Sequence, residues 1–227
     1  MKKITLFVTL LLLLFITLSV YTSHSLHEEN QPIYENKKDY PTKTDDRNTE
    51  FKVVIDPGHG GKDVGATGAS GQNEKDFTLS VSKKVQTLLK EESGIEVFMT
   101  RTEDSFISQE SRYRPKYANK LNADVFISIH GNTFTDPTVS GTETFYYHKH
   151  SKYLANLIQE KVVEATGFRD RGIQKKDLFV VRDTKMPAVL IEVGYLTNPQ
   201  EESEMWTEEF QDRVAASIVE GIKEYRS

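Results

Sequence analysis

The chain has no cysteine among its 227 residues, and this absence removes several kinds of chemistry. Disulfide bonds, thiol catalysis, cysteine-ligated metal and a lipid anchor on an N-terminal cysteine are excluded. The fold must therefore depend on its hydrophobic core. An excess of basic residues is also missing, because 29 lysines and arginines stand against 34 aspartates and glutamates, for a net charge of −5. This balance argues against nucleic acid as a partner, since nucleic acid selects a basic surface.

Four familiar motifs are absent as well. No G-x-S-x-G segment offers the nucleophile of a serine hydrolase, and no H-E-x-x-H segment offers a zincin site. A glycine-rich stretch at residues 58–63 is similar to phosphate-binding loops, but it breaks both patterns. Asp63 replaces the last glycine of the dinucleotide fingerprint, and no Ser or Thr follows Lys62 as a Walker loop requires. Phosphate transfer and dinucleotide chemistry are therefore not expected.

The N-terminal region predicts export. Lys2 and Lys3 precede an uncharged, strongly apolar run over residues 4–20, which is typical of a signal peptide or a short membrane anchor. Residues 1–26 are therefore predicted to be a cleaved signal or a retained anchor with possible membrane association. Residues 27–50 are polar and nearly free of aliphatic side chains, which predicts a flexible linker. Residues 51–227 are predicted to form one globular domain.

Strand-like and helix-like segments alternate along this domain. Apolar runs or period-two patterns predict strands near residues 53–55, 95–100, 124–130, 141–147, 178–181 and 187–193. Apolar residues at helical spacing predict helices near residues 77–89, 108–121, 153–165 and 206–222. Asn198, Pro199 and Glu201 are expected to start a further helix, as N-cap, first helical residue and capping glutamate. This alternation predicts an α/β fold with a sheet covered by helices on both faces.

Three of the predicted strands lead into polar residues. The first runs into a glycine-rich turn that contains His59, the strand near residue 129 ends on His130, and Glu192 follows a run of four apolar residues. A carboxylate in such a setting costs several kcal/mol unless something pairs with it. Because the carboxyl ends of parallel strands meet at one sheet edge, where α/β folds bind ligands, the three residues indicate a shared site.

These residue types allow specific chemistry and also plainer readings. Burial of Glu192 should raise its pKa, which suits a general base or acid; the alternative is a structural ion pair with Arg114 or Arg182. Two histidines and a carboxylate fit a catalytic zinc site with three protein ligands, although His59 could be a turn residue and His130 a core residue. Glu74 at a helix start is the preferred third ligand, with Asp56 and Asp76 as alternatives.

Four segments in this order resemble the zinc-dependent N-acetylmuramoyl-L-alanine amidases of bacterial cell walls, over about residues 52–225. Arg101, Arg114 and Arg182 also fall where that family has arginines. Gly131 departs from the family, in which many members have alanine. The four segments are Val54-Ile55-Asp56-Pro57-Gly58-His59-Gly60-Gly61, Asn73-Glu74-Lys75-Asp76, Phe126-Ile127-Ser128-Ile129-His130-Gly131-Asn132 and Leu190-Ile191-Glu192-Val193-Gly194-Tyr195-Leu196-Thr197-Asn198.

The resemblance implies a single twisted, mostly parallel sheet flanked by helices. It also implies one zinc ion held by His59, Glu74 and His130. Glu192 would act as general base and then acid, as water activated by the zinc cleaves the amide between N-acetylmuramic acid and L-alanine in peptidoglycan. Asn132 and Arg182 are predicted to contact the substrate.

The implied protein is an exported autolysin, active as a monomer at the cell wall or on the outer face of the cytoplasmic membrane. Two rivals are a non-catalytic wall-binding domain and a zinc amidohydrolase for small amides. The presence of all four site residues argues against the first, and the exported leader argues against the second.

Overall fold

A single six-stranded sheet organises the part of the chain that the computed structural model describes, residues 50–227. Its order is β2-β1-β3-β6-β4-β5. The four neighbouring strands β2, β1, β3 and β6 run parallel to one another. Strand β4 is antiparallel to β6, and β5 is parallel to β4. The strands are β1 (Phe51–Pro57), β2 (Ile95–Met99), β3 (Val125–Asn132), β4 (Thr142–Tyr146), β5 (Asp170–Lys175) and β6 (Ala188–Tyr195). The predicted fold class, a mixed and mostly parallel sheet with helices on both faces, is confirmed.

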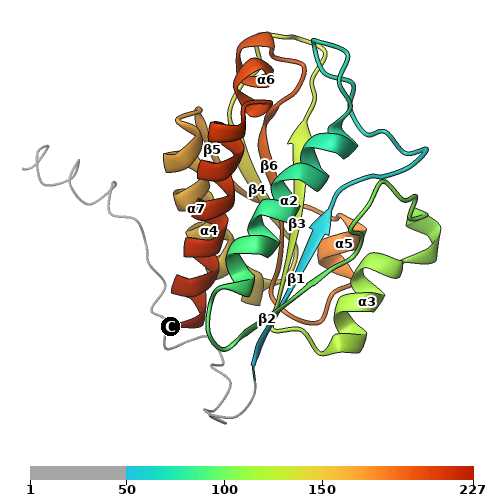
Figure 1. The fold of residues 1–227 in the computed structure, drawn as a ribbon, viewed down its shortest axis with the longest axis vertical. Helices are drawn as coiled ribbons and strands as arrows, with labels where there is room; N and C mark the ends of the chain where they lie inside the picture. Colours follow the sequence, from blue (N-terminus) through green and yellow to red (C-terminus); the bar gives the residue numbers. More distant parts are fainter. Residues whose placement is uncertain (1–49) are drawn as a thin grey trace, which may run out of the picture. The chain divides into compact units, whose positions relative to one another are not determined.

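Within residues 50–227, six α-helices connect and cover the strands (Figure 1). Two short 3-10 segments, Gln109–Ser111 and Lys149–Ser151, precede the second and third of them. None of the helices within residues 50–227 is both long and apolar enough to span a membrane. The predicted leader, and all but the last residue of the predicted linker, lie outside the described residues. The helices are α2 (Glu74–Lys90), α3 (Tyr113–Leu121), α4 (Lys152–Thr166), α5 (Phe179–Arg182), α6 (Pro199–Met205) and α7 (Glu208–Arg226).

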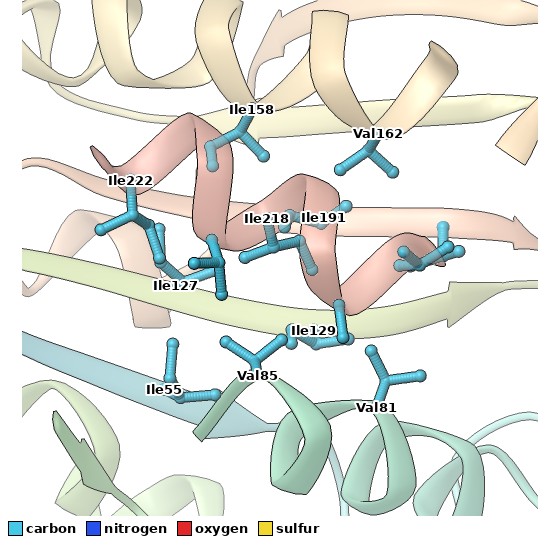
Figure 2. Packing of buried hydrophobic residues seen from close by; sticks show 14 of the residues in the cluster. Ile55, Val81, Val85, Ile127, Ile129, Ile158, Val162, Ile191, Ile218 and Ile222 are labelled. Carbon is cyan, nitrogen blue, oxygen red and sulfur yellow. The ribbon is translucent and has the colours of Figure 1, made fainter. Parts of the chain in front are cut away.

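The two faces of the sheet are covered unequally. Strand residues alternate between faces, so Ile55 and Ile127 pack with helices α2, α4 and α7 in a large core cluster (Figure 2). Val54 and Phe126 point the other way and join a smaller cluster with side chains from α3 and α5. Burial of an aliphatic or aromatic side chain of this size contributes about 1.5–3 kcal/mol. The larger cluster therefore supplies most of the hydrophobic stabilisation. The face of the sheet with the smaller cluster has fewer buried apolar side chains.

Two sequence predictions need correction. Residues 178–181 were expected to form a strand, but the segment makes one helical turn, α5, in which the amide of Arg182 donates to the carbonyl of Leu178 at 2.9 Å. A four-residue apolar run fits a buried turn as well as a strand, so its periodicity could not decide. Strand β5 was not predicted, because Ile173 is its only aliphatic residue.

Two helix predictions are also modified in detail. The helix expected over residues 108–121 is divided by Arg112, whose φ of 53° places it in the left-handed region. Asn198 does cap α6, with its side chain accepting from the amides of Gln200 and Glu201. The Glu201 carboxylate, however, accepts from the amides of Gly141 and Tyr195, both at 2.7 Å. Glu201 therefore joins the start of β4 to the end of β6 rather than closing a capping box.

Candidate active site

The predicted convergence of the three strand ends is present in the structure. In the parallel registers Pro57 of β1 lies beside Ile129 of β3, and His130 of β3 lies beside Glu192 of β6. His130 and Glu192 share the face of the smaller core cluster, because Phe126 and Ala188 in the same alternation belong to it. The carboxyl edge of the parallel strands is therefore the place where these polar groups meet.

Glu74, at the first residue of α2, lies between the two histidines. Its Oε1 is 2.8 Å from Nδ1 of His130, and its Oε2 is 3.2 Å from Nε2 of His59. Backbone amides of Gly131 and Ala66 also donate to this carboxylate, at 3.1 and 2.7 Å. The helix start, strand β3 and the loop at Ala66 therefore hold Glu74 in one orientation.

The three side chains form a set that could hold a metal ion. One ligand atom from each of His59, Glu74 and His130 lies within 4.8 Å of the others, and within residues 50–227 this is the only such group of histidine and acidic side chains. The alternatives Asp56 and Asp76 do not belong to it, since Asp56 is fully buried against Arg114 and Asp76 is exposed. Two imidazoles and one carboxylate are a donor set that suits zinc and leaves a coordination position open.

His59 is prepared for such a role by its partner Asp63. Its Nδ1 lies 2.8 Å from Oδ1 of Asp63, which leaves Nε2 directed at Glu74. A carboxylate on the far nitrogen of a histidine fixes the ring and its tautomer, as is common behind metal sites. His59 also has a φ of 59°, a conformation that costs a non-glycine residue of the order of 1–3 kcal/mol.

Two buried arginines hold the backbone of the segment that carries His59. Arg114 donates to the carbonyls of Pro57 and His59 at 2.6 and 2.7 Å, and it pairs with Asp56 at 2.6 Å. Arg101 donates to the carbonyls of Pro57 and Gly58 at 3.1 and 2.7 Å. These contacts compensate for the backbone strain at His59.

Burial, charges and hydrogen bonds at this site shift the pKa values of Glu74 and His59. Burial alone would raise the pKa of Glu74, but hydrogen bonds and charge from His130 and His59 hold that pKa well below its ordinary value. Burial would lower the pKa of His59, yet Glu74 and Asp63 raise it. Glu74 is therefore a carboxylate at any physiological pH, ready to act as a ligand.

Glu192 differs from Glu74 in having no hydrogen bond or ion pair within the described residues to offset its burial, and the positive charge of Lys176 opposes that effect only in part. Burial, reinforced by the negative charges of Glu74 and Glu143, raises the pKa of Glu192 well above its ordinary value. Its Oε2 is buried and makes no hydrogen bond within the described part of the chain. The ion pair considered from sequence is not formed, because Arg114 pairs with Asp56 and Arg182 pairs with Asp177 and Asp183. A buried, unpaired carboxyl group beside a possible metal site is suited to proton transfer.

The two predicted substrate contacts lie in different surroundings. Asn132 ends β3, and its side-chain amide donates to Glu143 at 2.7 Å. Arg182 lies on α5, where it pairs with Asp177 at 2.6 Å. Their roles remain predictions.

Glu143 was missed by the sequence analysis. It is buried at 4% exposure and is the register partner of Glu192 across the antiparallel β4–β6 pair. A signal was present in the sequence, since Glu143 alternates with Phe145 and Tyr147 and so lies on an otherwise aromatic face of the predicted strand. An acidic residue in that pattern indicates a polar partner inside the fold.

Comparison with known proteins identifies the family of this chain. The family profile described as N-acetylmuramoyl-L-alanine amidase matches residues 53–224. The chain is 41% identical over 177 residues to the uncharacterized protein YqiI of Bacillus subtilis, covering 76% of this chain and 84% of that protein. It is 34% identical to the probable cell wall amidase LytH of Staphylococcus aureus, covering 77% of this chain and 58% of LytH.

Solved structures give the same assignment. The catalytic domain of CwlV, an N-acetylmuramoyl-L-alanine amidase from Bacillus (Paenibacillus) polymyxa var. colistinus, superimposes with a TM-score of 0.75 at 46% identity, covering 77% of this chain and 97% of that domain. An N-acetylmuramoyl-L-alanine amidase from Clostridium difficile 630 gives a TM-score of 0.75 at 40% identity, with 78% and 97% coverage. This chain belongs to the N-acetylmuramoyl-L-alanine amidase family, hydrolases that act on the peptidoglycan of bacterial cell walls.

Proposed function

We propose that this amidase cleaves the bond between N-acetylmuramic acid and L-alanine with a zinc ion held by His59, Glu74 and His130, and with Glu192 as the proton-transfer group. The observation that carries the proposal is the carboxyl group of the partly buried Glu192, whose Oε2 is buried and makes no hydrogen bond within the described residues, at the strand position next to His130. Zinc, when bound, polarises a carbonyl and lowers the pKa of water.

The chain's own residues would then perform the remaining steps. Glu192 accepts the proton of the water that attacks the amide carbonyl, and the same carboxyl returns that proton to the departing L-alanine nitrogen. Because the surroundings of Glu192 favour its neutral form, it is a stronger base than an exposed glutamate. The Asp63 carboxylate keeps the His59 ring in place during the reaction.

The proposal is tested by Glu192→Gln, with Glu164→Gln on the exposed side of α4 as the matched control. Both proteins should retain zinc, measured by elemental analysis after dialysis. Release of L-alanine amino termini from peptidoglycan sacculi should fall about 10²–10⁴-fold in Glu192→Gln only, the range expected for a lost general acid–base group. Loss of zinc from Glu192→Gln would make Glu192 a ligand, and no release by the zinc-loaded natural protein would reject the activity.

The place of action is part of the same proposal. We infer that residues 1–26 direct the domain across the cytoplasmic membrane, that residues 27–50 link it, and that it acts on the wall as a monomer. The uncharged run at residues 4–20 and the similarity to a probable cell wall amidase support this location. Mass spectrometry of the protein from the cell-wall and membrane fractions identifies its first residue and so tests whether the leader is cleaved or retained. Light scattering of the purified protein tests whether it is a monomer. A full-length chain in the cytoplasm would contradict export.

A further inference from the structure

A short hairpin lies between the first two proposed metal ligands and ends on the second of them. This ligand hairpin, residues 66–74, closes on itself through an antiparallel bridge between Thr67 and Asn73. At its base the amide of Glu74 donates to the carbonyl of Ala66 at 2.9 Å. One end of the hairpin therefore carries a proposed metal ligand, and the position of the other end must be set by contacts of its own.

The base of the ligand hairpin orients one oxygen of Glu74. The Ala66 amide donates to Oε2 of Glu74 at 2.7 Å, and the same oxygen lies 3.2 Å from Nε2 of His59. The backbone passes so close that a Cβ on Gly65, which has a φ of 70°, would collide with Oε2 of Glu74 and with the His59 ring. Even a small shift of the hairpin would therefore disturb a ligand oxygen.

The tip of the ligand hairpin, residues 68–71, lacks large apolar side chains that could hold it in place. Its sequence is Gly-Ala-Ser-Gly, and Ala69, Ser70 and Gly71 are all exposed. A segment of glycines and small residues keeps a high conformational entropy unless hydrogen bonds fix it. The tip therefore depends on hydrogen bonds to neighbouring elements.

Glu202 supplies most of these hydrogen bonds from α6, at the same end of the sheet as the start of α2 (Figure 1). Its carboxylate accepts from the hydroxyl of Ser70 at 2.6 Å and from the amide of Ser70 at 3.0 Å. A second anchor is the amide of Ala69, which donates to the carbonyl of Leu196 at 2.9 Å. The tip is thus fastened to α6 and to the segment before it.

The burial of Glu202 indicates that this contact matters. Glu202 is only 3% exposed, and within residues 50–227 its carboxylate has no hydrogen-bond partner except Ser70 and no cationic partner. A carboxylate in such a place is costly unless its hydrogen bonds compensate for the lost water. The helix dipole favours an acidic residue in the first turn even when its side chain is exposed, so it does not explain the burial.

We propose that Glu202 is a positioning residue for Glu74, an inference that rests on the proposed zinc site. By fixing the tip of the ligand hairpin, Glu202 holds the Ala66 amide against Oε2 of Glu74. Removing a partner that orients a metal ligand typically weakens metal binding about 10- to 100-fold. Because Glu202 acts one step further from the metal, through the hairpin, its removal should cost about 10-fold, the lower end of that range.

Chelator competition on the full-length protein measures the zinc affinity. Glu202→Ala should bind zinc about 10-fold more weakly than the natural protein. Glu202→Gln should stay within about 3-fold, because its carboxamide can accept from the Ser70 amide and donate to the Ser70 hydroxyl. Glu204→Ala, which removes an exposed carboxylate from the same helix, is the matched control and should change the affinity less than about 2-fold.

A double variant separates positioning of Glu74 from a general loss of structure. Since Glu202 acts through Glu74, Glu202→Ala should cause no further loss of zinc affinity in a Glu74→Ala protein. An equal loss in both backgrounds, or no loss from Glu202→Ala alone, overturns the inference. Ser70→Ala, on the exposed tip, serves if Glu202→Ala does not fold: it removes only the hydroxyl contact and should weaken zinc binding about 2- to 3-fold, and an unchanged affinity overturns the inference equally.

The natural protein supplies a separate readout for the proposed function. Failure of the natural protein to bind zinc would reject the proposed zinc site itself. Zinc binding by the natural protein, with the same affinity in Glu202→Ala, would reject only the positioning role and leave the proposed function in place.

Discussion

Replacing Arg114 by methionine should destabilise the fold more than any exposed substitution. The Arg114–Asp56 pair is almost completely buried, with side chains 6% and 0% exposed and an N–O distance of 2.6 Å. Removing one partner of a buried pair costs about 3–5 kcal/mol, because the other charge stays buried without compensation. Asp56 keeps hydrogen bonds from Thr100 and Ser128, which places the expected loss near the lower end, at about 3–4 kcal/mol.

Urea unfolding followed by circular dichroism measures this loss. With a slope of about 2 kcal/mol per molar urea, the midpoint of Arg114→Met should fall by about 1.5–2 M. Arg213→Met is the matched control, since Arg213 is 44% exposed and its pair with Glu209 should contribute less than about 1 kcal/mol. The double variant with Asp56→Asn should lose less than the sum of the two single losses. A fall in the free energy of unfolding below about 1 kcal/mol for Arg114→Met would refute the reasoning.

Two further predictions concern the site itself. Gly58→Ala would place a Cβ against the His130 ring, so the variant should remain folded by circular dichroism but bind zinc at least about 10-fold more weakly in a chelator competition; unchanged zinc affinity would contradict this. Glu192→Gln should raise the melting temperature of the metal-free protein near pH 7. Because the pKa of Glu192 is raised in the folded protein, its contribution to stability is complete below the pKa of the unfolded chain, about 4.3, and is lost as pH rises through the folded-state pKa. The difference in melting temperature between the natural protein and Glu192→Gln should therefore close towards about pH 4. An equal difference at both pH values would exclude this linkage.

Much of the fold could be predicted because its signals are local. The apolar strands β1, β3 and β6 are each buried on both faces and have continuous hydrophobic sequences, as parallel central strands require. The helix α2 displays its stripe of Phe77, Val81 and Val85 directly in the sequence. Strand β5 and the helical turn α5 lack such signals. Strand β5 is held by pairing with β4 rather than by its own apolar residues, so only the assembled sheet explains it.

The residues of the site could be predicted from the sequence to different degrees. Glu192 and the two histidines stood out because polar residues that end apolar strands need a reason. Selecting Glu74 over Asp56 needed the family resemblance, since no local pattern says which acidic residue reaches two histidines from distant strands. The paired amides of Asn132 and Gln174 lie 42 positions apart and meet only through Glu143, a relation that exists in three dimensions alone.

The reversed direction of β4 divides the sheet into a parallel part, which carries the proposed metal ligands, and the β4–β5 pair. His59, Glu74 and His130 come from β1, α2 and β3, whereas Glu143 and Gln174 come from the β4–β5 pair on the far side of β6. The backbone of that pair contacts the rest of the sheet through β6 alone. Substitutions on β5 that keep its pairing with β4 should therefore leave the arrangement of His59, Glu74 and His130 unchanged.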